Sequence, residues 1–262
     1  MRTTSPAEVT AVLRGLGISP CDTVFLHSHL PAFGLVEGGP GALLSALLEA
    51  AGGSGTLAMP AFTLSFPKTR VWELESTPSE MGVLTEAFRK SPGALRSLHP
   101  IHSVTAVGAG AAALTGGWSA SSFGPGSAFE MLHEADAWLL CAGVGAERLT
   151  FVHYVEERCK VPYRAYKPFP GAVRSRGKDD LRVYTMYARD LRFKVSVDRF
   201  PAVLKDLKVG RSAPLAYGTL HAWRAREVFD AVQGLLRRDP GALLAPAAPF
   251  AELVSGAIAC TP

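Results

Sequence analysis

A histidine and a glutamate one helical turn apart could together remove a proton from a substrate. His153 and Glu156 lie in the segment 149–156, which follows an apolar run that ends in Gly-Val-Gly. This order predicts a buried strand, a loop and then a helix. On that helix Glu156 can reach the ring of His153 and fix its tautomer, as the acid partner of a general base does. Thr150 falls on the same arc of the helix as His153.

The apolar run 137–143 would place this helix at the carboxyl end of a central strand. Open α/β sheets bind their ligands at that end. The sequence therefore favours a functional His153, although a solvated or helix-capping histidine remains the alternative on these residues alone.

A second segment could hold an anion. The residues His27, Ser28, His29 and Leu30 close a predicted strand, and a glycine-rich turn, 33–39, leads into a helix. Glycines before a helix N-terminus leave backbone N–H groups free for a phosphate, and the helix dipole favours an anion there. The alternative is a turn that only connects the strand and the helix.

A third segment combines Arg96 with Ser97 and Ser103. An arginine offers a bidentate fork to a phosphate, and the two hydroxyls could add donors. A solvated loop with a capping serine is the alternative.

The bulk composition excludes several classes of protein. The chain has 262 residues, 48% of them hydrophobic and 19% charged, which is typical of a globular protein with a buried core. The net charge is +4, and the basic residues are scattered, which argues against nucleic acid as a partner. No run is long enough to cross a bilayer, the start lacks an apolar leader, and the four cysteines form no CxxC pair. These features predict a cytoplasmic protein without a membrane partner.

The elements expected before residue 160 alternate between strands and helices. Ser5 and Glu8 form a capping box for a first helix, and strands at 22–27 and 56–60 flank a helix that ends at Gly52. These two strands are therefore expected to form a parallel pair joined by a right-handed crossover. The other expected elements are a long packed loop at 61–79, helices at 80–89, 110–114 and 128–133, and a strand at 103–108.

The C-terminal third is expected to add peripheral elements. They are an antiparallel edge strand at 181–187, helices at 200–208 and 221–238, and a short helix in the tail 241–262. The expected fold class is α/β, with a mixed, mostly parallel central sheet flanked by helices in a single domain, 1–262. Residues 1–170 form its core, and residues 171–262 supply edge strands and C-terminal helices.

Five separated motifs carry a resemblance. In order they read HSHL, GTLAMPAFT, PSEMGVLTEAFR, GALRSLHPIHSVTAVG and LTFVHYVEE. The chain resembles the aminoglycoside 3-N-acetyltransferase family, which uses acetyl-CoA and does not have the GNAT fold. The match runs from about residue 8 to residue 170.

The resemblance implies a role for each motif, with acetyl-CoA as the acyl donor and no metal. The residues implied to line the pantetheine and pyrophosphate are His27, Ser28, His29, Leu30, Phe33, Gly34, Leu35 and Val36. Those implied to hold phosphate or the pantetheine amides are Arg96, Ser97 and Ser103. The family's T-x-x-H-x-x-E element is matched by Thr150, His153 and Glu156, with His153 as the base. The chain departs from the family at His29, where HSSL is usual, and at Ser127-Ala128, where a Ser-Pro pair is usual.

The chemistry of amine acetylation suits these residue types. A protonated amine cannot attack a thioester, so a neutral imidazole must accept its proton. Glu156 would then stabilise the imidazolium. The backbone amides of residues 28–30, or the Thr150 hydroxyl, are the candidates for stabilising developing charge on oxygen. Neither Cys141 nor Cys159 is placed as a nucleophile, so direct attack is expected.

The acceptor is the least constrained part of this hypothesis. The residues expected on its side are Glu37, Phe62, Trp72 and Glu80. A polycationic substrate would be expected to need a strongly acidic cleft, whereas the basic side chains of Arg96, Arg164, Lys167 and Arg174 could serve an anionic acceptor. We therefore expect the substrate to be a primary amine of an aminoglycoside, an amino sugar or another specialised metabolite, with antibiotic resistance as one role. The expected assembly is compatible with a homodimer.

Two other functions remain open at this stage. Six of the seven histidines precede residue 160, and the pairs His27/His29 and His99/His102 are spaced as some metal ligands are. A metal-dependent hydrolase is therefore one alternative. The other is a non-catalytic protein that binds coenzyme A.

Overall fold

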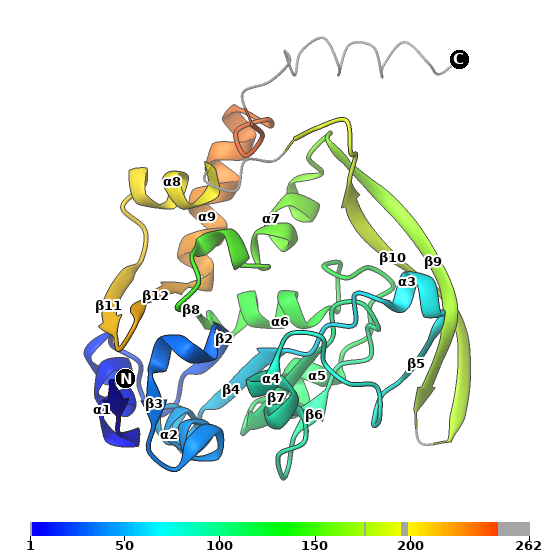
Figure 1. Cartoon of the computed structure of the whole chain (residues 1–262). Helices are drawn as coiled ribbons and strands as arrows, with labels where there is room; N and C mark the ends of the chain where they lie inside the picture. The colour runs from blue at the N-terminus through cyan, green and yellow to red at the C-terminus, as the bar shows by residue number, and fades with distance from the viewer. Residues whose placement is uncertain (1, 176, 195–198, 246–262) are drawn as a thin grey trace, which may run out of the picture.

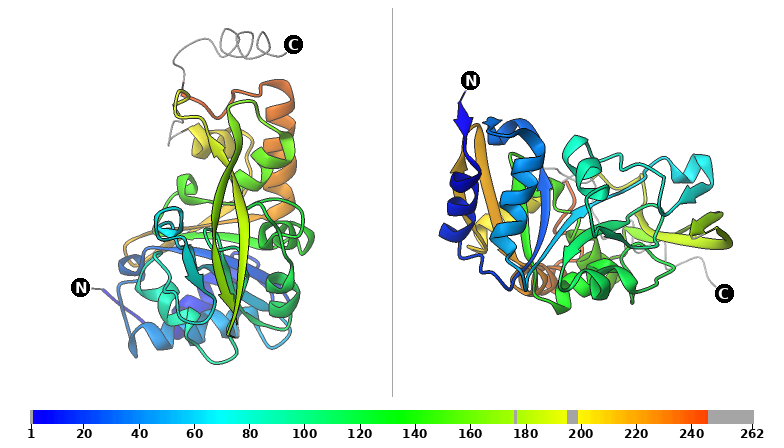
Figure 2. Two further views of the ribbon diagram at one scale, coloured as in Figure 1. Left: turned by 90° about the vertical axis from the view of Figure 1, so that its right-hand side faces the viewer. Right: turned by 90° about the horizontal axis from the view of Figure 1, so that it is seen from below.

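The computed structural model describes residues 2–175, 177–194 and 199–245. Its centre is a seven-stranded sheet with helices on both faces (Figures 1 and 2). The strand order across this sheet is β11 (Arg211–Leu215), β12 (Gly218–Arg224), β8 (Trp138–Ala142), β2 (Thr23–Ser28), β4 (Thr56–Pro60), β7 (Val104–Gly108) and β6 (Leu95–Arg96).

The sheet is mixed, as the sequence predicted, but only its centre is parallel. Strand β2 runs parallel to both β4 and β8, whereas β7, β6, β12 and β11 all join their neighbours in antiparallel pairs. The expectation of a mostly parallel sheet therefore holds for the three central strands alone. The predicted α/β class is correct, and its parallel centre is the part that ends beside the candidate catalytic helix.

One face of the sheet packs against three helices from the first ninety residues. They are α1 (Pro6–Gly15), α2 (Gly39–Ala51) and α4 (Val83–Arg89). The predicted capping box begins α1, because the Ser5 hydroxyl accepts from the Glu8 amide at 3.2 Å and the Glu8 carboxylate accepts from the Ser5 amide at 2.7 Å. Alternation along β2 points Val24 and Leu26 into this layer.

The opposite face carries the helices of the second layer. They are α5 (Ala111–Gly116), α6 (Ala128–Glu134), α7 (Val152–Cys159), α8 (Arg199–Asp206) and α9 (Ala225–Arg238). Phe25 of β2 and Cys141 of β8 point into this layer, which forms the larger of the two main hydrophobic clusters. Since α7 belongs to it, the candidate catalytic helix lies on this face of the sheet (Figure 1).

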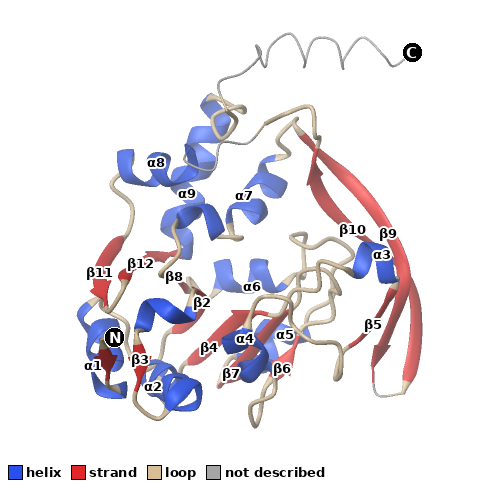
Figure 3. Cartoon of the chain, viewed as in Figure 1, coloured by secondary structure: helices blue, strands red, loops and turns tan. Residues whose placement is uncertain are grey.

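A second sheet stands at the side of the molecule. A long hairpin of β9 (Arg164–Ser175) and β10 (Lys178–Arg189) is joined by the short strand β5 (Val71–Glu73), next to α3 (Phe66–Thr69) (Figure 3). The remaining short elements are β1 (Thr3–Thr4), β3 (Leu35–Val36), η1 (Leu30–Phe33) and η2 (Ala146–Arg148). The hairpin starts directly after α7, so its first residues lie close to the helix.

The structure corrects three local predictions. The helix expected at 221–238 is a strand up to Arg224 and a helix only from Ala225, because residues 220–224 pair with β8. The helix expected at 80–89 begins at Val83, since Gly82 has a φ of 115°, which is incompatible with helix. The loop expected at 61–79 contains α3 and β5. Most of the short helix expected in the tail lies outside the described residues.

Among the residues that the structure describes, none belongs to a helix with both the length and the apolar character needed to cross a membrane.

Candidate active site

His153 lies in the first turn of α7, as predicted. Its amide donates to the Thr150 carbonyl at 3.0 Å, and its neighbours Val152 and Tyr154 are buried in the core. The side chain of His153 itself keeps 35% of its surface exposed. The amphipathic pattern of the helix thus leaves this ring within reach of a ligand.

The ring of His153 is oriented by Glu156. Its Nδ1 lies 2.6 Å from Oε2 of the buried Glu156 carboxylate. Burial by itself raises the pKa of Glu156, but the contacts with His153, Arg164 and Tyr163 outweigh it and hold the pKa at about 2. The carboxylate is therefore an anion that can only accept, so Nδ1 must carry the hydrogen. The lone pair is then on Nε2, which is the arrangement that a general base requires.

Two further residues complete the surroundings of the carboxylate. Tyr163 donates its hydroxyl to Glu156 Oε1 at 2.8 Å, and Arg164 Nη2 lies 2.8 Å from Oε2. Sequence reasoning missed both roles, because these residues follow the end of α7 and no helical spacing links them to Glu156. Pro162 and Pro168 bracket this segment, which argues against a helix but gives no indication of a contact with Glu156.

The charges around His153 favour its neutral form. Burial of the ring lowers its pKa, and the guanidinium of Arg164 lowers it further, whereas the hydrogen bond and charge of Glu156 act in the opposite direction. The net result is a pKa below the usual value of histidine. The surroundings of His153 thus favour the unprotonated imidazole, which is the form that can accept a proton.

An aromatic cluster lies behind the ring. Phe123 meets His153 edge to face at 5.6 Å between ring centroids, and the ring of His102 is 4.8 Å from Phe123. The Nδ1 of His102 contacts the Ser122 hydroxyl at 2.8 Å. Phe62, expected on the substrate side, is instead buried against His102 at 4.9 Å between centroids. It therefore supports the site from within the core.

The segment 27–36 lies at the carboxyl end of β2, as predicted. Ser28 is half-buried, His29 is exposed, and Leu30 and Phe33 belong to η1. The amide of His29 donates to the Ala142 carbonyl at 2.8 Å. This amide is therefore not free to stabilise charge on a substrate, which removes one of the expected donors.

The other residues of that segment have mixed surroundings. Gly34 has a φ of 74°, and a Cβ there would meet the Arg2 carbonyl oxygen at 2.5 Å. Leu35 is exposed and Val36 is buried. The predicted glycine turn is thus required by the backbone itself.

His27 stands out as a buried polar group without a partner. Its Nε2 is fully enclosed and accepts or donates no hydrogen bond among the described residues. Burial lowers the pKa of His27 to about 4, so the ring is neutral. The ring packs edge to face on Phe25 at 4.9 Å, which places it on the same face of the sheet as α7.

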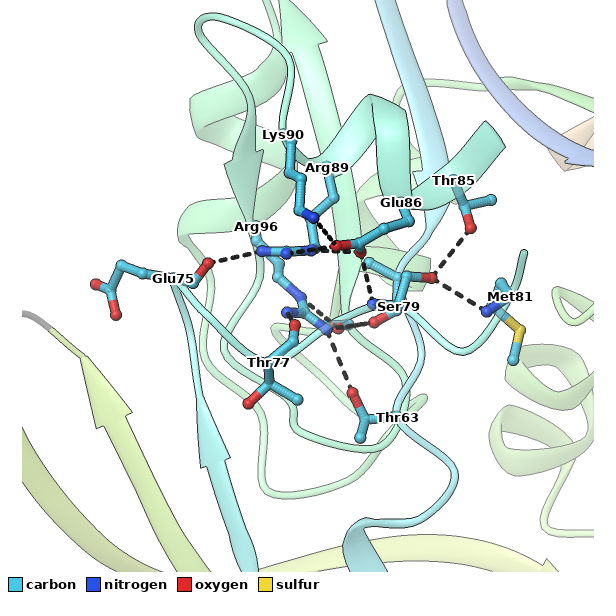
Figure 4. A network of polar contacts seen from close by, with 12 residues as sticks. Thr63, Glu75, Thr77, Ser79, Met81, Thr85, Glu86, Arg89, Lys90 and Arg96 are labelled. Carbon is cyan, nitrogen blue, oxygen red and sulfur yellow. Dashed lines mark hydrogen bonds and ion pairs between the residues drawn. The ribbon is translucent and has the colours of Figure 1, made fainter. Parts of the chain in front are cut away.

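Arg96 does not have the surroundings of a phosphate ligand (Figure 4). It is buried, and its Nε donates to the Ser103 hydroxyl at 3.0 Å. Its Nη1 donates to the Thr77 carbonyl and its Nη2 to the Ala61 carbonyl, each at 2.5 Å. Each nitrogen of the guanidinium is thus engaged by the protein, which does not support the expected contact with a cofactor.

The hydroxyls of Ser97 and Ser103, like the Arg96 guanidinium, form hydrogen bonds within the protein. The Ser97 hydroxyl accepts from the Val104 amide at 2.9 Å, and the Ser103 hydroxyl donates to the Ala61 carbonyl at 2.6 Å. Arg96 and these serines tie β6 to the segment after β4. The hydroxyl and guanidinium types that suggested a phosphate site therefore brace the loops around residues 61–103.

Burial argues against one of the residues expected on the substrate side, Trp72. Trp72 has no exposed surface, and its indole donates to Thr63 at 3.1 Å beneath the guanidinium of Arg96, so it is a core residue and not a substrate contact. Glu37 and Glu80 are exposed, and Glu80 accepts from the Ser65 amide at 3.1 Å. The burial of Trp72 agrees with the packed loop expected at 61–79, whereas its expected contact with a substrate is not supported.

We expect Arg96→Met to reduce stability without weakening coenzyme A binding. Loss of the donors leaves the Ala61 and Thr77 carbonyls unpaired, so the free energy of unfolding should fall by about 3 kcal/mol. Urea titration measures this change, and Arg174→Met, at an exposed arginine, is the control. Calorimetric titration with coenzyme A tests whether its affinity is unchanged. A tenfold weaker affinity at unchanged stability would restore the phosphate role of Arg96.

The spaced histidines do not form a metal centre. In residues 2–175, 177–194 and 199–245, no three side chains of His, Cys, Asp or Glu come together as a ligand group. His99 and His102 are instead buried in the protein interior. Nε2 of His99 lies 3.2 Å from the Thr185 carbonyl oxygen. The metal-dependent hydrolase therefore has no support in this geometry.

Comparison with known proteins places this site in a family. The family model for aminoglycoside 3-N-acetyltransferase matches residues 25–237, which contain the oriented histidine and its partners. The chain belongs to the aminoglycoside 3-N-acetyltransferase family. The prediction made from the short motifs is thus confirmed.

Individual members of the aminoglycoside 3-N-acetyltransferase family match over nearly the whole chain. Aminoglycoside N(3)-acetyltransferase VII of Streptomyces paromomycinus is 29% identical over 251 residues, covering 83% of this chain and 86% of the relative. Aminoglycoside N(3)-acetyltransferase IV of a Salmonella species is 27% identical over 240 residues, covering 92% and 90%.

A solved structure shares the fold. The crystal structure of a histidine-to-alanine mutant of aminoglycoside acetyltransferase AAC(3)-IVa, in complex with gentamicin, superposes with a TM-score of 0.79 at 26% identity. The superposition covers 94% of this chain and 93% of that one. The fold class expected from the sequence is therefore that of the family.

Proposed function

We propose that the protein transfers an acetyl group from acetyl-CoA to a primary amine of an aminoglycoside, with His153 as the general base. The observation that carries this proposal is the 2.6 Å contact between His153 Nδ1 and the buried Glu156 carboxylate. Family membership supplies the reaction class. The exposed part of the His153 ring supplies access for the acceptor.

The residues of α7 and its neighbours perform the proton transfer. An acceptor amine that approaches His153 would give its proton to Nε2 as its nitrogen bonds to the acyl carbon. The Nδ1–H then donates to Glu156 Oε2, whose charge stabilises the imidazolium. The C–S bond then breaks, and the departing thiolate of coenzyme A can take the proton back from the imidazolium. Among the described residues, the side-chain contact of the Thr150 hydroxyl is a long one, 3.5 Å from the Arg148 carbonyl, so we propose that it can orient a substrate.

The proposed reaction needs no covalent intermediate on the enzyme. Cys141 is fully buried within β8, and burial raises the pKa of its thiol, so it is neither accessible nor ionised. Burial also raises the pKa of Cys159. Direct attack of the amine on the acyl donor is therefore the route that the described thiols favour.

The segment that ends β2 fits the acyl donor. When bound, acetyl-CoA supplies a thioester whose carbonyl carbon accepts the amine. His27 offers a buried Nε2 without a partner, and the nearby α2 begins at Gly39 without any side-chain cap. Uncapped N–H groups at the start of a 13-residue helix suit a pyrophosphate. We propose His27, Ser28 and the 30–36 segment as the binding residues, without Arg96.

The surroundings of the basic residues favour an amine over an anionic acceptor. Arg164 is paired with Glu156, and Arg174 is paired with Glu73 at 3.2 Å and with Asp179 at 3.0 Å. Arg96 is engaged internally. These three arginines are thus already neutralised or buried, which leaves Lys167 as the exposed basic side chain of the four considered, and a related structure contains gentamicin.

A thiol-release assay tests the proposal. Purified protein is mixed with acetyl-CoA and one of three amines. They are gentamicin, an amino sugar without an acidic group and an amino sugar with an acidic group. We expect release of coenzyme A with gentamicin, together with a mass gain of one acetyl group in the product. Release with none of the amines, in protein that still binds coenzyme A, would favour the non-catalytic alternative.

The proposal also includes the setting of the enzyme. We propose that the enzyme acts in the cytoplasm, where the acyl donor is made. We also propose that the chain is a single domain and that it forms a homodimer. The homodimer is suggested by exposed apolar side chains on β10, since Leu181 is 81% and Val183 54% exposed. Light scattering on the purified protein tests the assembly, and a monomer at micromolar concentration would exclude it.

A further inference from the structure

We propose that Arg164 is a positioning residue for the acetyl transfer: it clamps Glu156 and disfavours protonation of His153 before the amine arrives. The inference rests on the proposed function. It assigns a role in the reaction to a side chain whose contact with the base is at Nδ1 and not at the nitrogen that accepts the proton.

The clamp is built on a single carboxylate. Oε2 of Glu156 faces both His153 Nδ1, at 2.6 Å, and Arg164 Nη2, at 2.8 Å. Arg164 Nη1 also donates to the Tyr187 carbonyl at 3.2 Å, which ties the clamp to β10. Only 9% of the Arg164 side chain and 3% of the Glu156 side chain are exposed, so water screens this contact weakly.

The charges of Glu156 and Arg164 together decide which protonation state of His153 is favoured. With His153 neutral, one buried anion faces one buried cation. Protonation of His153 would place a second cation 3.0 Å from Arg164 Nη2, on the same carboxylate oxygen. A histidine paired with a glutamate alone is instead stabilised as the imidazolium. Arg164 therefore adds to the effect of burial and shifts the pair toward the form that is ready to accept a proton.

Other groups around His153 do not duplicate this effect. From the segment after α7, Tyr163 contributes a neutral hydroxyl to the other carboxylate oxygen. From the loop before β7, His102 is buried and its pKa is well below the usual value, so it is uncharged. Phe123 is apolar. Among the described contacts of the ring, Arg164 is the cation and Glu156 is the anion.

The way Arg164 is buried argues against a purely stabilising role. Its Nε is enclosed without a hydrogen-bond partner among the described residues. A buried ion pair is often no more stabilising than an apolar replacement, and an unpaired buried N–H lowers stability further. The arrangement is poor for stability and favourable for keeping a base unprotonated.

The test is the acidity of His153 with and without the clamp. In Arg164→Gln, we expect the pKa of His153 to rise by about 1 to 3 pH units, because the opposing cation is gone. Histidine NMR signals measured across pH report this directly, and the signal that disappears in His153→Asn assigns the residue. The acid limb of kcat/KM should move to higher pH by the same amount, with activity recovering above it.

Two controls separate positioning from folding. Arg164→Lys restores a cation and should return the pKa of His153 toward its original value, whereas Arg174→Gln, at an exposed ion pair, should leave it unchanged. If Arg164→Gln lowers the rate equally at every pH, or leaves the NMR pKa unmoved in folded protein, the inference is overturned. The NMR readout needs no substrate, so failure of the proposed activity would be recognised separately.

Discussion

Replacing His153 with alanine should lower kcat for gentamicin acetylation by about 10²- to 10⁴-fold at neutral pH. The variant loses the Nε2 lone pair that accepts the amine proton, while Glu156 keeps its contacts with Arg164 and Tyr163. The fold and the binding of coenzyme A should therefore persist. Initial rates of thiol release, compared with calorimetric affinity for coenzyme A, measure both quantities.

A matched control uses another histidine of the same layer. His133→Gln changes a ring on α6 that stacks on Phe229 at 4.2 Å and contacts the Tyr154 hydroxyl of α7 at 3.3 Å, outside the described hydrogen bonds of Glu156. Its rate should remain within about twofold of the unmodified protein, as expected for a substitution outside the site. Equal losses in both variants would mean that the effect of His153→Ala comes from altered packing.

Replacing Glu156 with glutamine should have the largest effect on stability. The change leaves the Arg164 guanidinium buried without its anion, and breaking a buried pair in this way costs about 3–5 kcal/mol. It also removes the acceptor of Nδ1–H, so the ring loses its fixed tautomer and kcat should fall by roughly 10²-fold or more. Urea unfolding and thiol release measure the two effects.

The stability effect of Glu156→Gln should depend on pH with a definite sign. The pKa of Glu156 is about 2 in the folded protein, below that of an unfolded glutamate, so its contribution is full above about pH 5 and is lost as pH falls toward 2. The difference between the two proteins should shrink over that range. Glu86→Gln, at a more exposed ion pair, should cost less; an equal cost would contradict the importance of burial.

The helical pair was predictable from sequence, but its partners were not. The spacing of His153 and Glu156 is fixed by the helix itself, so the contact follows once α7 forms. Tyr163 and Arg164 reach the same carboxylate only because the chain turns back after Lys160, which has a φ of 51°. That turn, and the direction in which Arg96 and Trp72 point, depend on tertiary packing that no local pattern encodes.

Local sequence signals likewise predicted some elements of the fold and missed others. The capped helix α1 and the strands β2, β4 and β8 were predicted because caps and apolar runs are local signals. Strand β12 was mistaken for the start of a helix, since Leu220 and Ala222 pack on one face of the sheet while His221 and Trp223 occupy the other. Its pairing with β8, whose partner residues lie 78 to 86 positions earlier in the chain, outweighed the helical appearance of the sequence.

The most direct test of His153 as the base is the pH dependence of gentamicin acetylation in the unmodified protein and in His153→Ala. The unmodified enzyme should rise to a plateau at a pH below the pKa of the free amine, because the imidazole removes the proton. The variant should instead follow the fraction of unprotonated amine, with no plateau below that pKa. If both proteins gave the same profile and the same rate, His153 would not be the group that accepts the proton.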